Sequence, residues 1–176
     1  MATATCSRGD IEVVFHIMKN GADGNCLFYA ISQCLVVVDG VSVKKWKSSQ
    51  YLHASLRKAL CNFYDNSDAV CQMLSKWQRD NLDDLLSIIT CDDRRMCVPN
   101  GYASEMDLKI MAILLNVDIV VYRSVLSGDF VGRFSKEVYQ GARVQNADTT
   151  IFILFRSLGR GSPNIPNHFE ALIPRK

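Results

Sequence analysis

The stretch Asn20–Ser32 constrains the fold of this chain more than any other part of its sequence. Its first half holds two glycines, an aspartate and two asparagines, which adopt positive φ angles or bond to their own backbone, so it predicts a turn. Its second half becomes apolar at helical spacing, which predicts a helix from Cys26 to about Leu35. Cys26 therefore lies where a loop becomes the first turn of a helix.

This position gives a cysteine the surroundings that a nucleophile needs. The free N–H groups and the positive dipole end of a helix N-terminus favour a thiolate over a thiol. The backbone N–H groups of Gly24, Asn25 and Cys26 are also candidates to stabilise an oxyanion formed when the thiolate attacks a carbonyl. Asp23 is predicted to cap the helix with its carboxylate. The pattern indicates a cysteine hydrolase, which also needs a general base.

A histidine near the C-terminal end is the candidate base. His168 follows a loop rich in glycine and proline and opens a predicted strand. Because residues i and i+2 share one face of a strand, Glu170 is predicted to lie beside the imidazole and orient it. His168 would take the thiol proton of Cys26 and later protonate the leaving amine. Asn167 and Asn20 remain alternatives for the orienting role.

Three segments together resemble the ovarian-tumour (OTU) family of cysteine proteases. They are Asp23–Ser32 with its Asp-Gly-Asn-Cys-Leu-Phe motif, the helix-then-strand segment Gly101–Tyr122, and Asn167–Pro174. The family often has Trp-Gly-Gly where this chain has Asn100-Gly101-Tyr102, and it usually has Asp or Asn in place of Glu170. The resemblance implies an α/β (α+β) protein with the papain-like OTU fold, in which helices flank a central mixed β-sheet.

The same resemblance implies a cysteine-dependent deubiquitinase that hydrolyses isopeptide bonds after the C-terminal glycine of ubiquitin. Cys26 would be the nucleophile, His168 the general base, and Asp23 a residue that shapes the oxyanion loop. Ubiquitin or polyubiquitin would be the partner. Two alternatives stay open: an OTU-fold protease that acts on another ubiquitin-like modifier or a polyprotein, and a ubiquitin-binding module whose catalysis is weak because Glu170 fails to orient His168.

Length and charge restrict the remaining classes of protein. A chain of 176 residues suits one domain, so we expect a flexible N-terminus over residues 1–9 and a single catalytic domain over 10–176. A net charge of +2 without a long basic run gives no indication of nucleic-acid or anionic-membrane binding. No apolar segment approaches the roughly 20 residues that a membrane-spanning helix requires. The first residues lack the pattern of a signal peptide.

The cysteines indicate a reducing compartment. There are seven, none of them in a CxxC pair, and several lie at apolar positions with helical spacing. No zinc-binding pattern is present in the sequence, and we expect neither a metal nor a cofactor. We therefore expect a monomeric cytoplasmic protein, located in the host cytoplasm if the chain comes from a virus or a bacterial effector.

Local patterns predict the remaining elements. His16 lies in a predicted strand and is a rival base, although a histidine in a short apolar strand is more often structural. Ser104 is expected to cap a helix that Asn116 ends, with Glu105 as a helix-start carboxylate. The other predictions are strands at 11–17, 117–122, 130–134 and 149–155, helices at 48–63, 70–77 and 82–89, a turn at 127–129 and irregular structure at 135–149.

Overall fold

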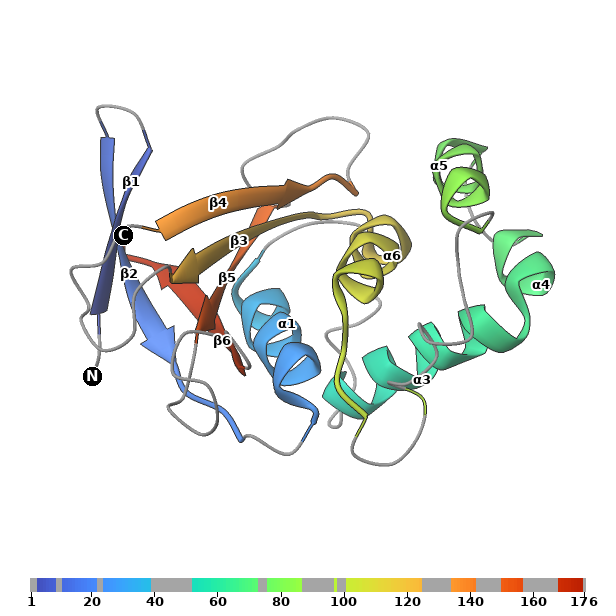
Figure 1. Cartoon of the computed structure of the whole chain (residues 1–176), viewed down its shortest axis with the longest axis horizontal. Helices are drawn as coiled ribbons and strands as arrows, with labels where there is room; N and C mark the ends of the chain where they lie inside the picture. The colour runs from blue at the N-terminus through green and yellow to red at the C-terminus, as the bar shows by residue number, and fades with distance from the viewer. Residues whose placement is uncertain are drawn as a thin grey trace.

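In a computed structural model of the chain, six strands form one mixed sheet in the order β1-β2-β6-β5-β3-β4 (Figure 1). Strands β3 and β5 pair in parallel, and the other neighbouring strands pair antiparallel. The structure describes residues 3–8, 11–21, 24–38, 52–72, 76–86, 97, 101–124, 134–141, 150–156 and 168–175. The strands are β1 (Thr3–Arg8), β2 (Ile11–Met18), β3 (Asp118–Ser124), β4 (Phe134–Tyr139), β5 (Thr150–Arg156) and β6 (His168–Pro174).

Two helices of the described chain, α1 and α6, pack against the sheet, and the others pack on these two or on one another. Helix α1 lies against β5 and β6, and α6 lies against β3 and β4 (Figure 1). Helix α3 packs on α1 and α6, and α4 and α5 follow it away from the sheet before α5 returns to α6. Their bounds are α1 (Cys26–Val37), α3 (Leu52–Asp65), α4 (Ser67–Gln72), α5 (Lys76–Leu86) and α6 (Glu105–Leu115).

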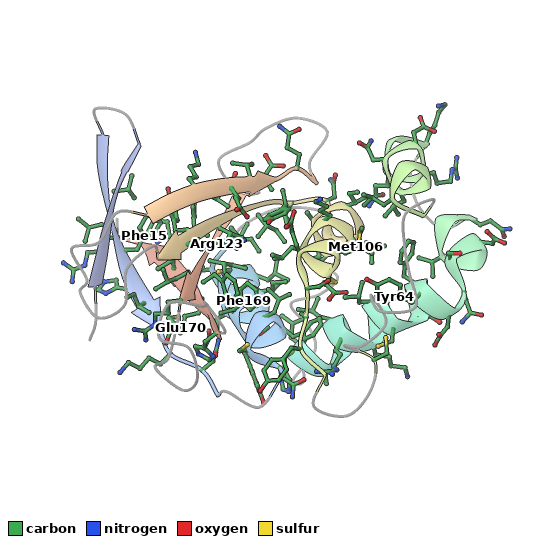
Figure 2. The ribbon with its side chains drawn as sticks, in the orientation of Figure 1. Phe15, Tyr64, Met106, Arg123, Phe169 and Glu170 are labelled. Carbon is green, nitrogen blue, oxygen red and sulfur yellow. The ribbon has the colours of Figure 1, made fainter. Side chains whose placement is uncertain are left out.

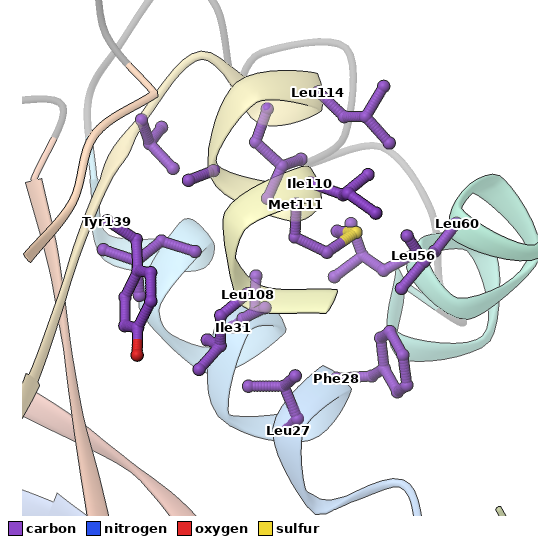
Figure 3. Close-up of a cluster of buried hydrophobic side chains, with 14 of the residues drawn as sticks. Leu27, Phe28, Ile31, Leu56, Leu60, Leu108, Ile110, Met111, Leu114 and Tyr139 are labelled. Atoms are coloured by element: carbon purple, nitrogen blue, oxygen red, sulfur yellow. The ribbon is translucent and has the colours of Figure 1, made fainter. Parts of the chain in front are cut away.

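The larger hydrophobic core holds α1 in place. Figure 3 shows Phe28 and Ile31 of α1 beside Leu56 of α3 and Leu108 and Met111 of α6. These side chains are buried together with residues of β3, β5 and β6 on one face of the sheet. Because α1 is enclosed by the sheet and two other helices, the position of its first residue is determined by the core. Burying a large aliphatic or aromatic side chain contributes about 1.5–3 kcal/mol.

A smaller core covers the opposite face of the sheet. Its buried members come from four strands: Phe15, Ile17, Val120, Tyr122, Leu154 and Leu172. The Phe15 ring lies 5.9 Å from that of Tyr122 and 5.2 Å from that of Phe152, measured between ring centroids. Alternate residues of β3 and β5 therefore enter the two cores in turn. This confirms the prediction that the apolar strand at 149–155 is central, and it confirms the α/β fold class with its mixed sheet and packed helices.

Several predicted boundaries agree closely with the structure. Helix α1 begins at Cys26, and the expected strands at 11–17, 117–122 and 149–155 are β2, β3 and β5. Ser104 caps α6 with its side chain, and Asn116 ends the helix with a φ of 55°. Asparagine tolerates this left-handed conformation better than most residues, which explains why the helix stops there.

The two edge strands were not predicted correctly. In the N-terminal segment expected to be loose, Thr3–Arg8 form β1, and Phe134–Tyr139 form β4, mostly inside the stretch expected to be irregular. The β1 sequence is mostly polar, and half of the β4 residues are polar. An edge strand has a neighbour on one side only and keeps polar residues toward solvent, so it lacks the apolar pattern of an internal strand. The predicted helix at 70–77 overlaps the end of α4, which runs to Gln72, and the start of α5 at Lys76; residues 73–75 lie outside the described residues. The predicted turn at 127–129 lies outside the described residues.

Candidate active site

Cys26 is the first residue of α1, and its side chain is buried with 3% exposure. Gly24 lies two residues earlier with a φ of 84°, a left-handed conformation that glycine adopts without strain. The N-cap residue, Asn25, makes no capping hydrogen bond with its side chain. Its carboxamide oxygen is therefore not placed over the first turn of α1. Asp23 lies outside the described residues, so its predicted capping and loop-shaping roles stay predictions.

The side chain of Asn20 joins the start of α1 to the start of β6. Its Nδ2 donates to the backbone carbonyl of Cys26 at 3.2 Å and to that of Phe169 at 3.0 Å, 149 residues away in the chain. The Cys26 backbone consequently lies beside the backbone of the residue that follows His168. The structure thus brings the two halves of the predicted site together. Asn20 was a candidate to orient His168; its Nδ2 is used to join these two segments, and its orienting role stays a prediction.

His168 opens β6 and is 2% exposed. Its Nε2 lies 3.9 Å from a carboxylate oxygen of Glu170, and its buried Nδ1 has no hydrogen-bond partner among the described residues. Burial lowers the pKa of this imidazole below its usual value near 6.5; the Glu170 carboxylate opposes that effect and the Arg156 guanidinium adds to it. The neutral form, which can accept a proton on Nδ1, is therefore favoured near neutral pH.

Glu170 of β6 (Figure 2) is 2% exposed. Its main partner is Arg156. Arg156 Nη2 donates to Oε1 at 3.0 Å, and Nε forms an ion pair with Oε2 at 2.7 Å. The Nη2 contact is a hydrogen bond, whereas the Nε contact is an ion pair without hydrogen-bond geometry. The 3.9 Å separation from His168 is too long for a hydrogen bond, so Glu170 acts on the imidazole through its charge.

Sequence reasoning missed Arg156, because its contact with Glu170 follows from strand register. Arg156 is the antiparallel partner of His168, and Leu154 is the partner of Glu170, so all three polar side chains share one face of the sheet. An arginine at the end of a central apolar strand is a signal for such a buried acidic partner. Its position opposite a given carboxylate follows only from the pairing of β5 with β6.

Arg57 of α3 holds the loop that precedes Cys26. Its Nη1 donates to the carbonyl of Gly24 at 3.2 Å and to Oδ1 of Asn25 at 2.7 Å, and its Nη2 donates to the carbonyl of Gly101 at 3.0 Å. The guanidinium carbon also lies 5.6 Å from the centroid of the Phe28 ring. Sequence reasoning missed this residue as well. Its signal was an arginine directly beside the apolar stripe of a predicted helix.

The segment after Gly101 is fixed by a buried carboxylate. Asp107 is fully buried, accepts a hydrogen bond from Tyr64 Oη at 2.7 Å, and accepts another from the Ser104 backbone N–H at 2.5 Å. The Asp107 N–H donates in return to Ser104 Oγ at 3.4 Å, which completes a capping box. Glu105 begins α6 as predicted, and its exposed carboxylate forms an ion pair with Lys109 at 3.2 Å.

A cavity of about 180 Å³ lies between the start of α6 and the sheet. Ser104 and Glu105 form part of one side, and Phe155 and Phe169 form part of the other. The two phenylalanine rings stack with centroids 4.2 Å apart and an interplanar angle of 13°. Phe169 directly follows His168 in β6, and adjacent strand residues point to opposite faces of the sheet, so the cavity lies on the face opposite the His168 side chain.

A sequence model of the OTU-like cysteine proteases matches residues 21–157. The chain belongs to the OTU-like cysteine proteases. The matched region contains Cys26, and it ends before the strand that carries His168 and Glu170. No curated protein matches the chain in sequence.

Solved structures of OTU domains have the same fold as this OTU-like protein. The viral OTU domain protease from Dera Ghazi Khan virus superposes with a TM-score of 0.57 at 18% identity, covering 92% of this chain and 82% of that one. The Hazara virus OTU bound to ubiquitin gives 0.57 at 14% identity, with coverage of 99% and 96%. An OTU deubiquitinase from Wolbachia pipientis bound to ubiquitin gives 0.53 at 14%, with coverage of 92% and 96%.

The site of this OTU-like protein contains the parts required for acyl transfer. A cysteine begins a helix, an uncharged imidazole is favoured nearby, and a loop of backbone amides precedes the cysteine. The rival base His16 accepts a hydrogen bond from Arg175 on its Nε2. Within the described residues, no group of three or more His, Cys, Asp or Glu side chains is placed to hold a metal ion. No helix in the described part of the chain is long and apolar enough to cross a membrane.

Proposed function

We propose that this protein is a deubiquitinase that hydrolyses the isopeptide bond after the C-terminal glycine of ubiquitin. The observation that supports the proposal is the Asn20 bridge, which joins the backbone of Cys26 to that of Phe169, the residue after His168. Family membership supports cysteine protease chemistry. The choice of ubiquitin is supported by two OTU structures of the same fold whose partner is ubiquitin.

In the proposed mechanism, His168 is the general base and Cys26 the nucleophile. Nδ1 of His168 accepts the thiol proton, and the sulfur attacks the glycine carbonyl carbon to form a tetrahedral oxyanion. The backbone N–H groups of Gly24, Asn25 and Cys26 stabilise this oxyanion. The imidazolium then protonates the leaving lysine amine, and a thioester forms between ubiquitin and Cys26. Water, activated by His168, hydrolyses the thioester and restores the thiol.

The cavity beside Phe169 supports a narrow substrate. Two glycines have no side chains, so a Gly-Gly tail fits a channel that excludes most other sequences. The cavity of about 180 Å³ lies between Ser104 and the stacked phenylalanines, and it is of the size expected for a short extended segment. We propose that it receives the residues just before the scissile bond. In this proposal the occupant of the cavity is the C-terminal tail of ubiquitin. The cytoplasmic location of the protein stays a prediction.

The direct test uses ubiquitin with an electrophilic group at its C-terminus. Wild-type protein should gain the mass of one ubiquitin, Cys26→Ala should gain none, and His168→Ala should react more slowly. A parallel panel of ubiquitin-like modifiers tests the choice of substrate. Folded wild-type protein that reacts with another modifier but not with ubiquitin would contradict the proposal, and so would equal labelling of the Cys26→Ala variant.

One observation favours a second candidate function, a ubiquitin-binding module with weak catalysis. Glu170 is engaged by Arg156 and lies 3.9 Å from His168, so it does not hold the imidazole by a hydrogen bond. In this case Cys26→Ala would bind ubiquitin, and the wild type would bind it equally well without turnover. Turnover of a fluorogenic ubiquitin substrate at rates typical of an enzyme, above about 1 per second, would exclude this alternative.

A further inference from the structure

The Arg57 side chain of α3 donates hydrogen bonds to acceptors in the segment before Cys26 and in the segment at Gly101, rather than within its own helix. Its guanidinium joins α3 to two segments that are distant in sequence, the loop at Gly24 and Asn25 and the segment at Gly101. None of these three acceptors belongs to α3. The contacts therefore set the position of the loop before Cys26 relative to α3.

The peptide group between Gly24 and Asn25 is the one that Arg57 orients. Because a trans peptide is planar, its C=O and N–H point in opposite directions. The Gly24 carbonyl is directed at Arg57, so the Asn25 N–H is directed away from it. The Asn25 carbonyl accepts the first helical hydrogen bond, from Tyr29 N at 2.9 Å, so the Cys26 N–H points out of the N-terminal end of α1.

We propose that Arg57 is a positioning residue that fixes this peptide so that the Asn25 N–H serves as an oxyanion donor. The inference rests on the proposed acyl-transfer function, because an oxyanion forms only when Cys26 attacks a carbonyl. Arg57 itself does not touch the reacting atoms. It also holds Asn25 Oδ1 away from the helix N-terminus, which keeps that side chain from competing for the same N–H groups.

The residue type fits this role. An arginine fork has fixed N–H directions and binds several oxygen acceptors at once, whereas a lysine ammonium is a single point charge on a flexible stem. The guanidinium plane also lies over Phe28, which is buried in the core, so its orientation is restricted by packing. Arg57→Lys should therefore restore only part of the function that Arg57→Gln removes.

The experiment compares two reactions of Cys26 that differ in their need for an oxyanion hole. Acylation by p-nitrophenyl acetate passes through a tetrahedral oxyanion and needs no ubiquitin. Alkylation by iodoacetamide is a direct displacement at carbon and forms no oxyanion. Both rates are measured at Cys26 by mass spectrometry of the tryptic peptide, with Cys26→Ala as the background. Lys58→Gln is the matched control, since Lys58 is the exposed neighbour of Arg57 on α3 and its loss removes the same charge.

Arg57→Gln should slow acylation by roughly tenfold or more while changing alkylation by about twofold at most, because removing a donor costs transition-state stabilisation only where an oxyanion develops. Lys58→Gln should leave both rates unchanged. An equal fall in both rates would overturn the proposal, because it would place Arg57 in the fold or in thiolate formation. Unchanged acylation would overturn it too, and so would wild-type acylation no faster than that of Cys26→Ala. If the wild type is acylated by the ester but ignores electrophilic ubiquitin, the substrate proposal fails and the inference about Arg57 stands.

Discussion

Two buried carboxylates, one at the start of α6 and one in β6, have different kinds of partner. Asp107 accepts hydrogen bonds from the Tyr64 hydroxyl and the Ser104 backbone N–H, which keep their protons near neutral pH. Glu170 faces the Arg156 guanidinium and the His168 imidazole, whose pKa is lowered below 6.5 by burial. The first carboxylate therefore stabilises local structure, whereas the second lies beside the imidazole that we propose as the general base.

Replacing the carboxylate at the start of α6 should have the largest effect on stability. Asp107→Ala leaves the buried Tyr64 hydroxyl and the Ser104 N–H without their acceptor, and we expect a loss of about 3 kcal/mol in the free energy of unfolding. Urea denaturation measures it. Activity per folded molecule should stay near that of the wild type at low temperature. A stable variant that has lost activity would show that Asp107 is more than structural.

Replacing the carboxylate in β6 should act mainly on the rate. Glu170→Gln keeps the shape of the side chain but removes the charge that stabilises an imidazolium, and we expect roughly a hundredfold fall in kcat/KM, equivalent to about 2.7 kcal/mol. Hydrolysis of a fluorogenic ubiquitin substrate measures this effect. Full activity in Glu170→Gln would assign Glu170 to the structural class of Asp107, as the partner of Arg156 alone.

The pKa of His168 should respond to replacement of Glu170 and not to replacement of Asp107. Because the pKa of His168 is lowered below 6.5, the acid limb of the rate should lie below that value, and Glu170→Gln should move it further down. The unfolded state binds more protons between the lowered pKa and 6.5, so His168 makes the fold less stable as pH falls through that window. Titration of the imidazole by NMR in the Cys26→Ala background measures the pKa of His168 and its further fall in Glu170→Gln. A rise in the pKa of His168 in Glu170→Gln would contradict the proposed effect of the Glu170 charge. The control variant Asp107→Asn should leave the pKa of His168 unchanged.

The smallest effect is expected at Glu105, the exposed carboxylate of the same helix turn as Asp107. Its ion pair with Lys109 spans 3.2 Å between two side chains that are 59% and 41% exposed. Solvent screens such pairs, so Glu105→Gln should change the free energy of unfolding by about 0.5 kcal/mol or less. Thermal denaturation of this variant beside Asp107→Ala tests whether burial decides the difference. A loss comparable to that of Asp107→Ala would refute that explanation.

The sequence determined the features that depend on short-range patterns. The positive φ of Gly24 and the helix that Cys26 begins follow from a glycine placed just before a run of apolar residues. The caps of α6 at Ser104 and Asn116 follow from side chains that bond to the nearby backbone or adopt a positive φ. The same-face placement of His168 and Glu170 follows from the two-residue repeat of a strand. Each of these depends on residues within a few positions of one another.

Only the tertiary structure decided which distant groups meet. Asn20 bonds the Cys26 carbonyl and the carbonyl of Phe169, which lies 149 residues from Asn20 in the chain. Arg57 of α3 donates to the Gly24 carbonyl in the loop before Cys26, and Arg156 forms an ion pair with Glu170. These contacts depend on the register of β5 with β6 and on the packing of α3 against α1, neither of which leaves a repeat in the sequence. Local propensity fixes a residue's own backbone. A buried polar partner is chosen by the whole fold, because most buried donors and acceptors of a folded chain are hydrogen-bonded, often to residues distant in sequence.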